Sequence, residues 1–142
     1  MTRRYQSESI VAAEAAELYR ALTDLRRWPA WDPGLESVEP EGEGAVVAGS
    51  RFVLKPRGGP RVRMRVEVAE AARRFVDVAH LPLARMRTAH DLEAAPGGGT
   101  RVRVSIEVSG PLAWLWDRVI ARPQAAGATA QTEALAAHAR AS

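Results

Sequence analysis

Residues 100–116 read TRVRVSIEVSGPLAWLW, and the change of pattern within this stretch decides the fold class. Up to Val108, apolar residues alternate with polar ones, which is the period of a strand with one face in a core and the other in water. Gly110 and Pro111 then end the strand, and proline fits the first position of a helix because its missing N–H costs no hydrogen bond there. From Leu112 on, apolar residues recur at helical spacing. The stretch therefore predicts an antiparallel strand followed directly by a helix.

Other parts of the chain carry the same alternation or a short apolar run, and turn signals separate them. PRGGP at residues 56–60 and PGGG at residues 96–99 favour tight turns, and Leu81 and Pro82 separate two further runs. The stretches expected as strands are residues 4–12, 51–55, 61–68, 75–79, 85–93 and 101–108. Their pattern predicts an antiparallel sheet of six or seven strands with one buried face.

Two short helices are expected between the first strand and the rest of the sheet. Residues 14–22 place apolar side chains at helical spacing, and Thr23 and Asp24 supply N-cap chemistry for a second short helix around residues 25–28. Pro29 and Pro33 prevent that helix from extending, because proline lacks a donor and restricts the residue before it.

The last element is expected to be one long helix over residues 111–140, kinked at Pro123, with Gly127 one turn later. Only this helix is long enough to cover one face of the sheet. The side chains expected to face the sheet are Leu112, Leu115, Trp116, Val119, Ile120, Ala126, Ala130, Ala134 and Ala137. Trp114 is expected to be partly exposed.

This order of elements, together with DLRRWPAWDP at residues 24–33, resembles the START-like superfamily, also called SRPBCC. Within it, the chain looks most like the polyketide cyclase/dehydrase and lipid-transport group. Further matching stretches are IVA at residues 10–12, GSRF at 49–52, GGTR at 98–101 and SGPL at 109–112. The resemblance covers essentially the whole chain.

The resemblance implies one START-like domain over residues 1–142 with an α+β helix-grip fold. In that fold a six- or seven-stranded antiparallel sheet curves around a long C-terminal helix, and two short helices follow the first strand. The superfamily includes cyclases, lipid carriers and hormone receptors, and it has no universal catalytic motif. Fold therefore does not fix function here.

Composition narrows the function classes. The chain has no cysteine, which excludes disulfides and thiolate chemistry, and no histidine or carboxylate spacing indicates a metal site. We expect no cofactor. The start of the chain lacks an apolar run, so no signal peptide is expected. No stretch approaches 18 uninterrupted apolar residues, so no transmembrane helix is expected, and the expected location is the cytoplasm. The net charge is only +3, and the excess of arginine over lysine fits a coding bias better than specific nucleic-acid binding.

A polar patch is expected inside the apolar face of the sheet. Met86, Thr88 and His90 occupy every second position of one expected strand and therefore share its inward side. A two-residue turn at residues 82–83 would place Asp77 beside them. His80 would then point outward. A polar group inside an apolar cavity is typical of small-molecule sites, although a buried His–Asp pair is also common in ordinary cores. His90 and Asp77 are the only catalytic candidates.

Three functions remain open at this stage. The first is binding of a small hydrophobic ligand, lipid-like or polyketide-like, between the sheet and the last helix by a monomer or weak dimer. The expected cavity residues are Trp28, Trp31, Phe52, Leu54, Met64, Val66, Phe75, Asp77, Met86, Thr88, His90, Leu115, Trp116, Val119, Ala126 and Ala130. Alternatively, Trp28 and Trp31 could only fill the core.

The second function is that of a cyclase/dehydrase-like enzyme that uses the same cavity, with His90 and Asp77 moving protons.

The third function is binding of a partner through a basic convex face of the sheet. The outward arginines are Arg61, Arg63, Arg65, Arg85, Arg87, Arg101 and Arg103. Asp91 and Glu93 are expected to lie across the last hairpin from Arg103 and Arg101, which would pair part of this charge.

Overall fold

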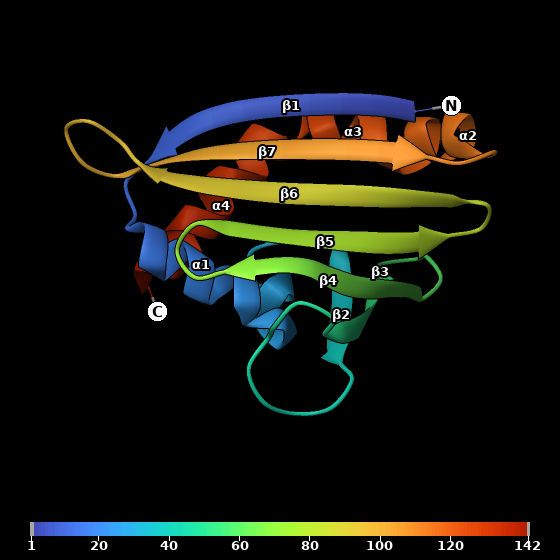
Figure 1. The fold of residues 1–142 in the computed structure, drawn as a ribbon, viewed down its shortest axis with the longest axis horizontal. Coiled ribbons are helices and arrows are strands. Elements are labelled where there is room, and N and C mark those ends of the chain that lie inside the picture. The colour runs from blue at the N-terminus through green and yellow to red at the C-terminus, as the bar shows by residue number, and fades with distance from the viewer. Residues whose placement is uncertain (1, 142) are drawn as a thin grey trace.

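The computed structural model describes residues 2–141, which form a seven-stranded antiparallel sheet with helices on one face (Figure 1). The strands are β1 (Thr2–Val11), β2 (Leu35–Pro40), β3 (Arg51–Pro56), β4 (Val62–Glu70), β5 (Arg74–Leu81), β6 (Ala84–Ala94) and β7 (Thr100–Ser109). Their order in the sheet is β1-β7-β6-β5-β4-β3-β2. The predicted α+β class and the curved antiparallel sheet are confirmed.

The strand β2 had no signal in the alternation of the sequence. Its buried residues are Leu35 and Val38, which are three positions apart rather than two. The pairing of β2 with β3 shifts register between Leu35 and Ser37, and such a bulge inserts one residue without changing the buried face. The irregularity therefore hid the strand from a search for a period of two.

The two short helices form as predicted after β1, but neither Thr23 nor Asp24 caps the second one with its side chain. Helix α1 (Ala15–Thr23) begins with a capping box, in which the Glu17 carboxylate accepts a hydrogen bond of 3.0 Å from the backbone N–H of Glu14. The second is a 3-10 helix, η1 (Leu25–Ala30), which includes Pro29. It directs Trp28 into the core.

The C-terminal helix is segmented rather than continuous. It comprises α2 (Ala113–Trp116), a π-helical turn η2 (Asp117–Ala121), α3 (Arg122–Ala126) and α4 (Ala128–Ala141). The helix begins at Ala113, not at Pro111. Pro123 cannot donate a backbone hydrogen bond, and in the turn before it Arg122 bonds to the carbonyl of Asp117, five residues back. Gly127 breaks the helix between α3 and α4.

The helices cover the inner face of the sheet behind β1, β7 and β6, with α4 packed against α1 and β1 (Figure 1). Arg61, Arg63 and Arg65 are exposed on the opposite face, as predicted. No described helix is both long and apolar enough to cross a membrane.

The buried stripe of the C-terminal helix differs from the prediction. Ala126, Ala130 and Ala137 are exposed, whereas Trp116, Ile120 and Ala134 pack against the core as predicted. The fully buried residues are Ala113, Asp117, Ala121, Ala128, Thr132, Leu135, Ala136 and Ala139. Asp117 is only 1% exposed because its carboxylate accepts hydrogen bonds from Tyr5 Oη at 2.6 Å and from Arg122 at 3.1 Å. A pattern based on hydrophobicity cannot predict that a carboxylate lies at the centre of the buried face.

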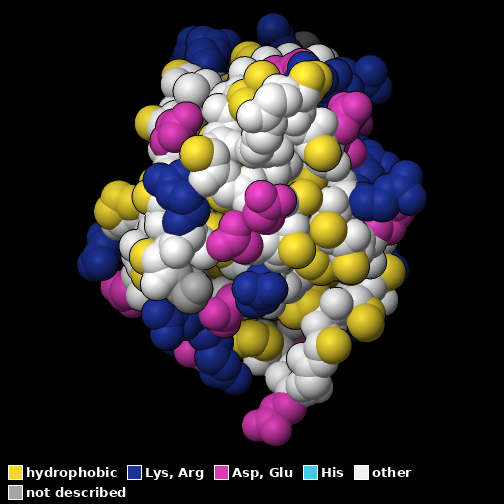
Figure 2. Space-filling model, turned by 90° about the vertical axis from the view of Figure 1, so that its left-hand side faces the viewer, with side chains coloured by type: hydrophobic (Ala, Val, Ile, Leu, Met, Phe, Trp, Pro, Cys, Tyr) yellow, Lys and Arg dark blue, Asp and Glu magenta, His cyan; other side chains and the backbone are white. Residues whose placement is uncertain are grey.

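The outer face of the sheet carries a mixture of paired and unpaired charges. Arg103 lies opposite Asp91 in the predicted register, but its guanidinium contacts Glu8 at 3.5 Å, while Asp91 pairs with Arg74 at 3.0 Å. At the end of the molecule shown in Figure 2, positive and negative side chains are interspersed. The charge on that end is therefore largely mixed rather than of one sign.

Candidate functional site

A cavity of about 580 Å³ lies between the inner face of the sheet, η1 and the C-terminal helix around Pro123. Most of its wall is apolar. Its lining residues are Leu22, Trp28, Trp31, Asp32, Gly34, Leu35, Leu54, Pro56, Val62, Met64, Asp77, Ala79, Leu81, Met86, Thr88, His90, Val119, Ile120, Pro123, Gln124 and Gln131. We refer to this space as the cavity.

The residues predicted to line a cavity fall into two groups. Those found on its wall are Trp28, Trp31, Leu54, Met64, Asp77, Met86, Thr88, His90 and Val119. Those that lie elsewhere are Phe52, Val66, Phe75, Leu115, Trp116, Ala126 and Ala130.

Each residue of the second group is displaced for a structural reason. Phe52, Val66 and Phe75 are at most 1% exposed because other side chains fully cover them in the core. The indole of Trp116 turns away to donate a 2.9 Å hydrogen bond to the carbonyl of Pro82. Ala126 and Ala130 are exposed and Leu115 is only half-buried, since the fully buried positions of the helix before Pro123 are Ala113, Asp117 and Ala121.

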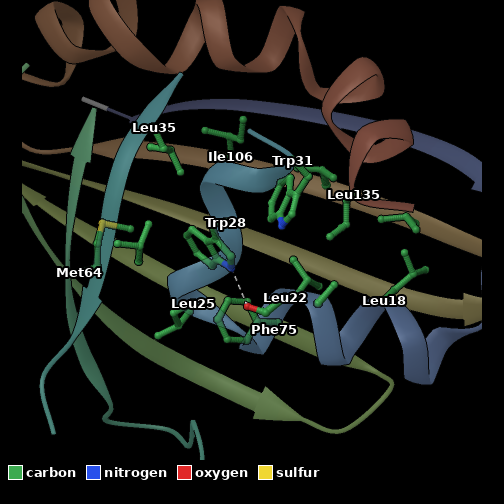
Figure 3. Packing of buried hydrophobic residues seen from close by; sticks show 14 of the residues in the cluster. Leu18, Leu22, Leu25, Trp28, Trp31, Leu35, Met64, Phe75, Ile106 and Leu135 are labelled. Atoms are coloured by element: carbon green, nitrogen blue, oxygen red, sulfur yellow. Dashed lines mark hydrogen bonds between the residues drawn. The ribbon is translucent and has the colours of Figure 1, made fainter. Parts of the chain in front are cut away.

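Two tryptophans form the aromatic part of the wall (Figure 3). The Trp28 indole N–H donates to the carbonyl of Leu22 at 3.0 Å, and its ring meets Phe52 edge-on at 5.4 Å between centroids. Trp31 lies 6.0 Å from Trp28, but its Nε1 has no hydrogen-bond partner among the described residues. Trp28 is thus fixed within the core, whereas Trp31 keeps an unused donor.

The predicted polar patch is present on the wall. Asp77 pairs directly with Thr88 across the β5–β6 hairpin, and His90 is the next inward residue of β6. Asp77 is 5% exposed and, within the described residues, makes no side-chain hydrogen bond or ion pair. Nδ1 of His90 likewise has no partner there. His80 is exposed on the outer face, as predicted.

Burial sets the protonation of both residues. It raises the pKa of Asp77 to about 7, because a carboxylate loses its hydration inside the apolar wall. It lowers the pKa of His90 to about 4, and the charge of nearby Asp91 only partly opposes this effect. Near neutral pH the imidazole of His90 is therefore uncharged, whereas the carboxyl group of Asp77 can gain or lose a proton.

A second polar group on the wall had no signal in the sequence pattern. The carboxylate of Asp32 accepts a 2.7 Å hydrogen bond from Gln131 of α4 and a 3.0 Å bond from the N–H of Gly34. This contact joins the loop after η1 to the C-terminal helix across 99 residues of sequence. Ala79, which the same alternation places on the inward face of β5, also lines the cavity, and Leu81 extends this series by one more position.

Among the described residues no group of histidines and carboxylates could hold a metal ion. The site is an apolar cavity with one carboxyl group, that of Asp77, that has no partner among the described residues, and with the neutral His90 on the same wall. A cavity of this kind can hold a small molecule, orient it through a few polar atoms, and exchange a proton with it.

The fold is a helix grip, with the cavity between the sheet and the C-terminal helix. The family model described as polyketide cyclase/dehydrase and lipid transport matches residues 2–140, and the chain belongs to this family. The predicted resemblance is confirmed. No curated protein matches the chain.

Solved structures share the fold at low sequence identity. A hypothetical protein, jhp0584, from Helicobacter pylori has a TM-score of 0.80 at 16% identity, covering 96% of this chain and 88% of that one. The Zhui aromatase/cyclase from Streptomyces sp. R1128 has a TM-score of 0.76 at 15% identity, covering 99% and 94%. Norcoclaurine synthase from Thalictrum flavum has a TM-score of 0.73 at 15% identity, covering 98% and 94%. At these identities the likeness concerns the fold alone.

Proposed function

We propose that this protein binds a small, largely apolar molecule in the cavity. The observation that carries the proposal is the combination of an apolar cavity of about 580 Å³ with the buried side chain of Asp77 on its wall, whose carboxyl group has no partner among the described residues. Cavities of this size and composition are typical of small-molecule sites. The family includes lipid transport in its description, and this agrees with a carrier function.

Polar atoms that lack a hydrogen-bond partner favour a cavity that holds a ligand over a cavity that stays empty. A buried polar group without a partner costs roughly 1–3 kcal/mol, so native proteins keep few of them. Trp31 Nε1, His90 Nδ1 and the Asp77 carboxyl group all belong to residues of the same wall. A bound molecule with a polar atom near Asp77 would satisfy its carboxyl group, whereas Trp31 Nε1 and His90 Nδ1 are themselves covered by protein atoms.

A variant that fills the cavity tests this proposal. Ala79 is 3% exposed and lines the cavity between Met64 and Met86, its partners on the neighbouring strands. Ala79→Leu should weaken binding of the neutral dye Nile red at least about tenfold, since the added atoms occupy ligand volume. Titrations followed by dye fluorescence measure this change.

Ala130→Leu supplies the matched control, because the same change is made on an exposed position of α4. It should leave the dye affinity within about twofold. The proposal fails if Nile red does not bind with saturation, or if both variants weaken binding equally.

A second candidate is an enzyme that uses the same cavity. The specific observation in its favour is the pKa of about 7 at Asp77, a value suited to general acid–base catalysis near neutral pH. The neighbouring Zhui structure is named as an aromatase/cyclase, which is consistent with such chemistry. If a substrate turns over, Asp77→Asn should lower the rate by about 10²–10⁴-fold and leave substrate affinity nearly unchanged.

A further inference from the structure

The charge on the cavity wall differs from that of the protein as a whole. The chain has 20 lysines and arginines against 17 aspartates and glutamates, yet among the described residues no lysine or arginine lines the cavity. Within residues 2–141, the acidic side chains on its wall are those of Asp32 and Asp77. Four other hollows in the surface each include at least one arginine.

The two carboxyl groups are not equivalent. The carboxylate of Asp32 already accepts hydrogen bonds from the Gln131 side chain and from the backbone N–H of Gly34. Asp77 is nine-tenths buried or more and has no partner in the described structure, although it borders a space large enough for a ligand. It is therefore the group that a ligand would contact.

The wall around Asp77 offers no compensation for a second negative charge. Val66 of β4 pairs with Asp77 on one side, and Thr88 of β6 pairs with it on the other. A carboxylate placed here would be desolvated beside Asp77 without a cation to pair with, which is costly. A cation would instead gain a buried partner, and Trp28 and Trp31 present aromatic rings that attract positive charge.

We propose that the ligand of this cavity is a small aromatic or apolar molecule that carries a basic nitrogen, that its ammonium group binds Asp77, and that the cavity excludes carboxylate ligands such as fatty acids. This inference rests on the proposed binding function and specifies its ligand class.

Three naphthalene derivatives that differ only in their polar group test the inference. They are naphthylethylamine, naphthylethanol and naphthylacetate, titrated by calorimetry at pH 8. The amine should bind at least about tenfold more tightly than the alcohol, and the acetate at least about tenfold more weakly. Asp77→Asn should remove the preference for the amine and change the affinity for the alcohol less than about threefold. Glu93→Gln, an exposed carboxylate on the same sheet, is the control and should alter neither.

The dependence on pH gives a second measurement that needs no variant. The groups of the wall that can carry charge near Asp77 are His90 and Asp32. The pKa of His90 is about 4, so His90 stays neutral between pH 6 and 8, whereas Asp77 ionises there with a pKa of about 7. Affinity for the amine should therefore rise up to about tenfold from pH 6 to pH 8, and affinity for the alcohol should not rise.

The outcomes separate this inference from the proposed function. If neither Nile red nor any naphthalene derivative binds, the proposed function is wrong. If Nile red binds but the acetate binds as tightly as the amine, or the amine does not bind, only the ligand class is overturned. An amine preference that persists in Asp77→Asn, or an amine affinity that is flat from pH 6 to 8, also overturns it.

Discussion

At the scale of single residues, Asp77 and His90 have opposite effects on the pH dependence of stability. The pKa of Asp77 is about 7 in the folded protein against 3.8 for an unperturbed aspartate. The unfolded chain therefore binds fewer protons than the native protein between these values, and stability falls as pH rises through them. The pKa of His90 falls from 6.5 to about 4, so its contribution is present above pH 6.5 and is lost as pH falls to 4.

Replacing Asp77 by asparagine should reveal the first effect. Asp77→Asn removes the charge that burial disfavours, so the variant should gain stability over the unmodified protein as pH rises from 4 to 7. The gain in the free energy of unfolding should level off above pH 8 at a few kcal/mol, the order of magnitude that the raised pKa of Asp77 implies. Urea unfolding at pH 4, 6 and 8 measures this difference. A constant difference between the two proteins would show that Asp77 is not desolvated.

The residue scale also shows what the sequence could and could not indicate about the site. Alternation along β6 and a two-residue turn were enough to bring Asp77, Thr88 and His90 to one wall. They could not indicate that Asp77 rather than His90 titrates near neutral pH, because that depends on burial from several strands and η1. The bond between Asp32 and Gln131 has no local pattern at all.

At the scale of elements, the sequence predicted the turn between β5 and β6 correctly, whereas it predicted the buried face of the C-terminal helix only in part. Pro82 and Leu83 form the predicted two-residue turn, with Leu83 at a φ of 55°, and this fixes the register of β5 against β6. The buried face of the C-terminal helix could not be extrapolated from Leu112 and Trp116. A buried, hydrogen-bonded Asp117 and a π turn break the simple apolar period.

Gly110 should be essential for the transition from β7 to the C-terminal helix. Its φ is 116°, and a Cβ there would lie 2.7 Å from the carbonyl oxygen of Leu83 and 2.9 Å from Cα of Ala84. Gly110→Ala should therefore destabilise the protein by about 3 kcal/mol, from backbone strain and steric overlap together. Thermal and urea unfolding measure the loss.

Gly58 provides the comparison, since its φ is also positive, at 72°, but a Cβ there meets no atom within 4 Å. Gly58→Ala should cost only about 1 kcal/mol, the cost of the left-handed conformation alone. Equal losses at the two positions would contradict the steric role assigned to Gly110.

At the scale of the whole molecule, the outer face of the sheet concentrates positive charge at β3 to β6. Arg51 lies directly opposite Arg65, and Arg63 and Arg85 flank His80. Burial lowers the pKa of the His80 imidazole, and these four arginines lower it further. Like charges opposite one another are unfavourable, and an anionic partner would relieve them.

We expect this face to bind polyanions weakly and without specificity. Affinity for RNA should fall steeply with salt, and replacing Arg63 and Arg85 by glutamine should reduce the slope of that dependence. Replacing Arg101 and Arg103, which already contact Glu8, should reduce the slope less. Fluorescence anisotropy from about 20 to 200 mM salt measures both. Tight binding that persists at the highest salt would instead favour a partner-binding function for this face.

The central claim is that a small molecule enters the cavity, and the methyl groups of Met64 and Met86 report on it directly. Both residues line the cavity, and each is 7% exposed. Methyl NMR of protein labelled at methionine therefore gives two signals from the wall, which Met64→Leu and Met86→Leu assign. Titration with Nile red should shift both signals with one common saturation curve. Saturable dye binding that leaves both wall signals unchanged would contradict the account.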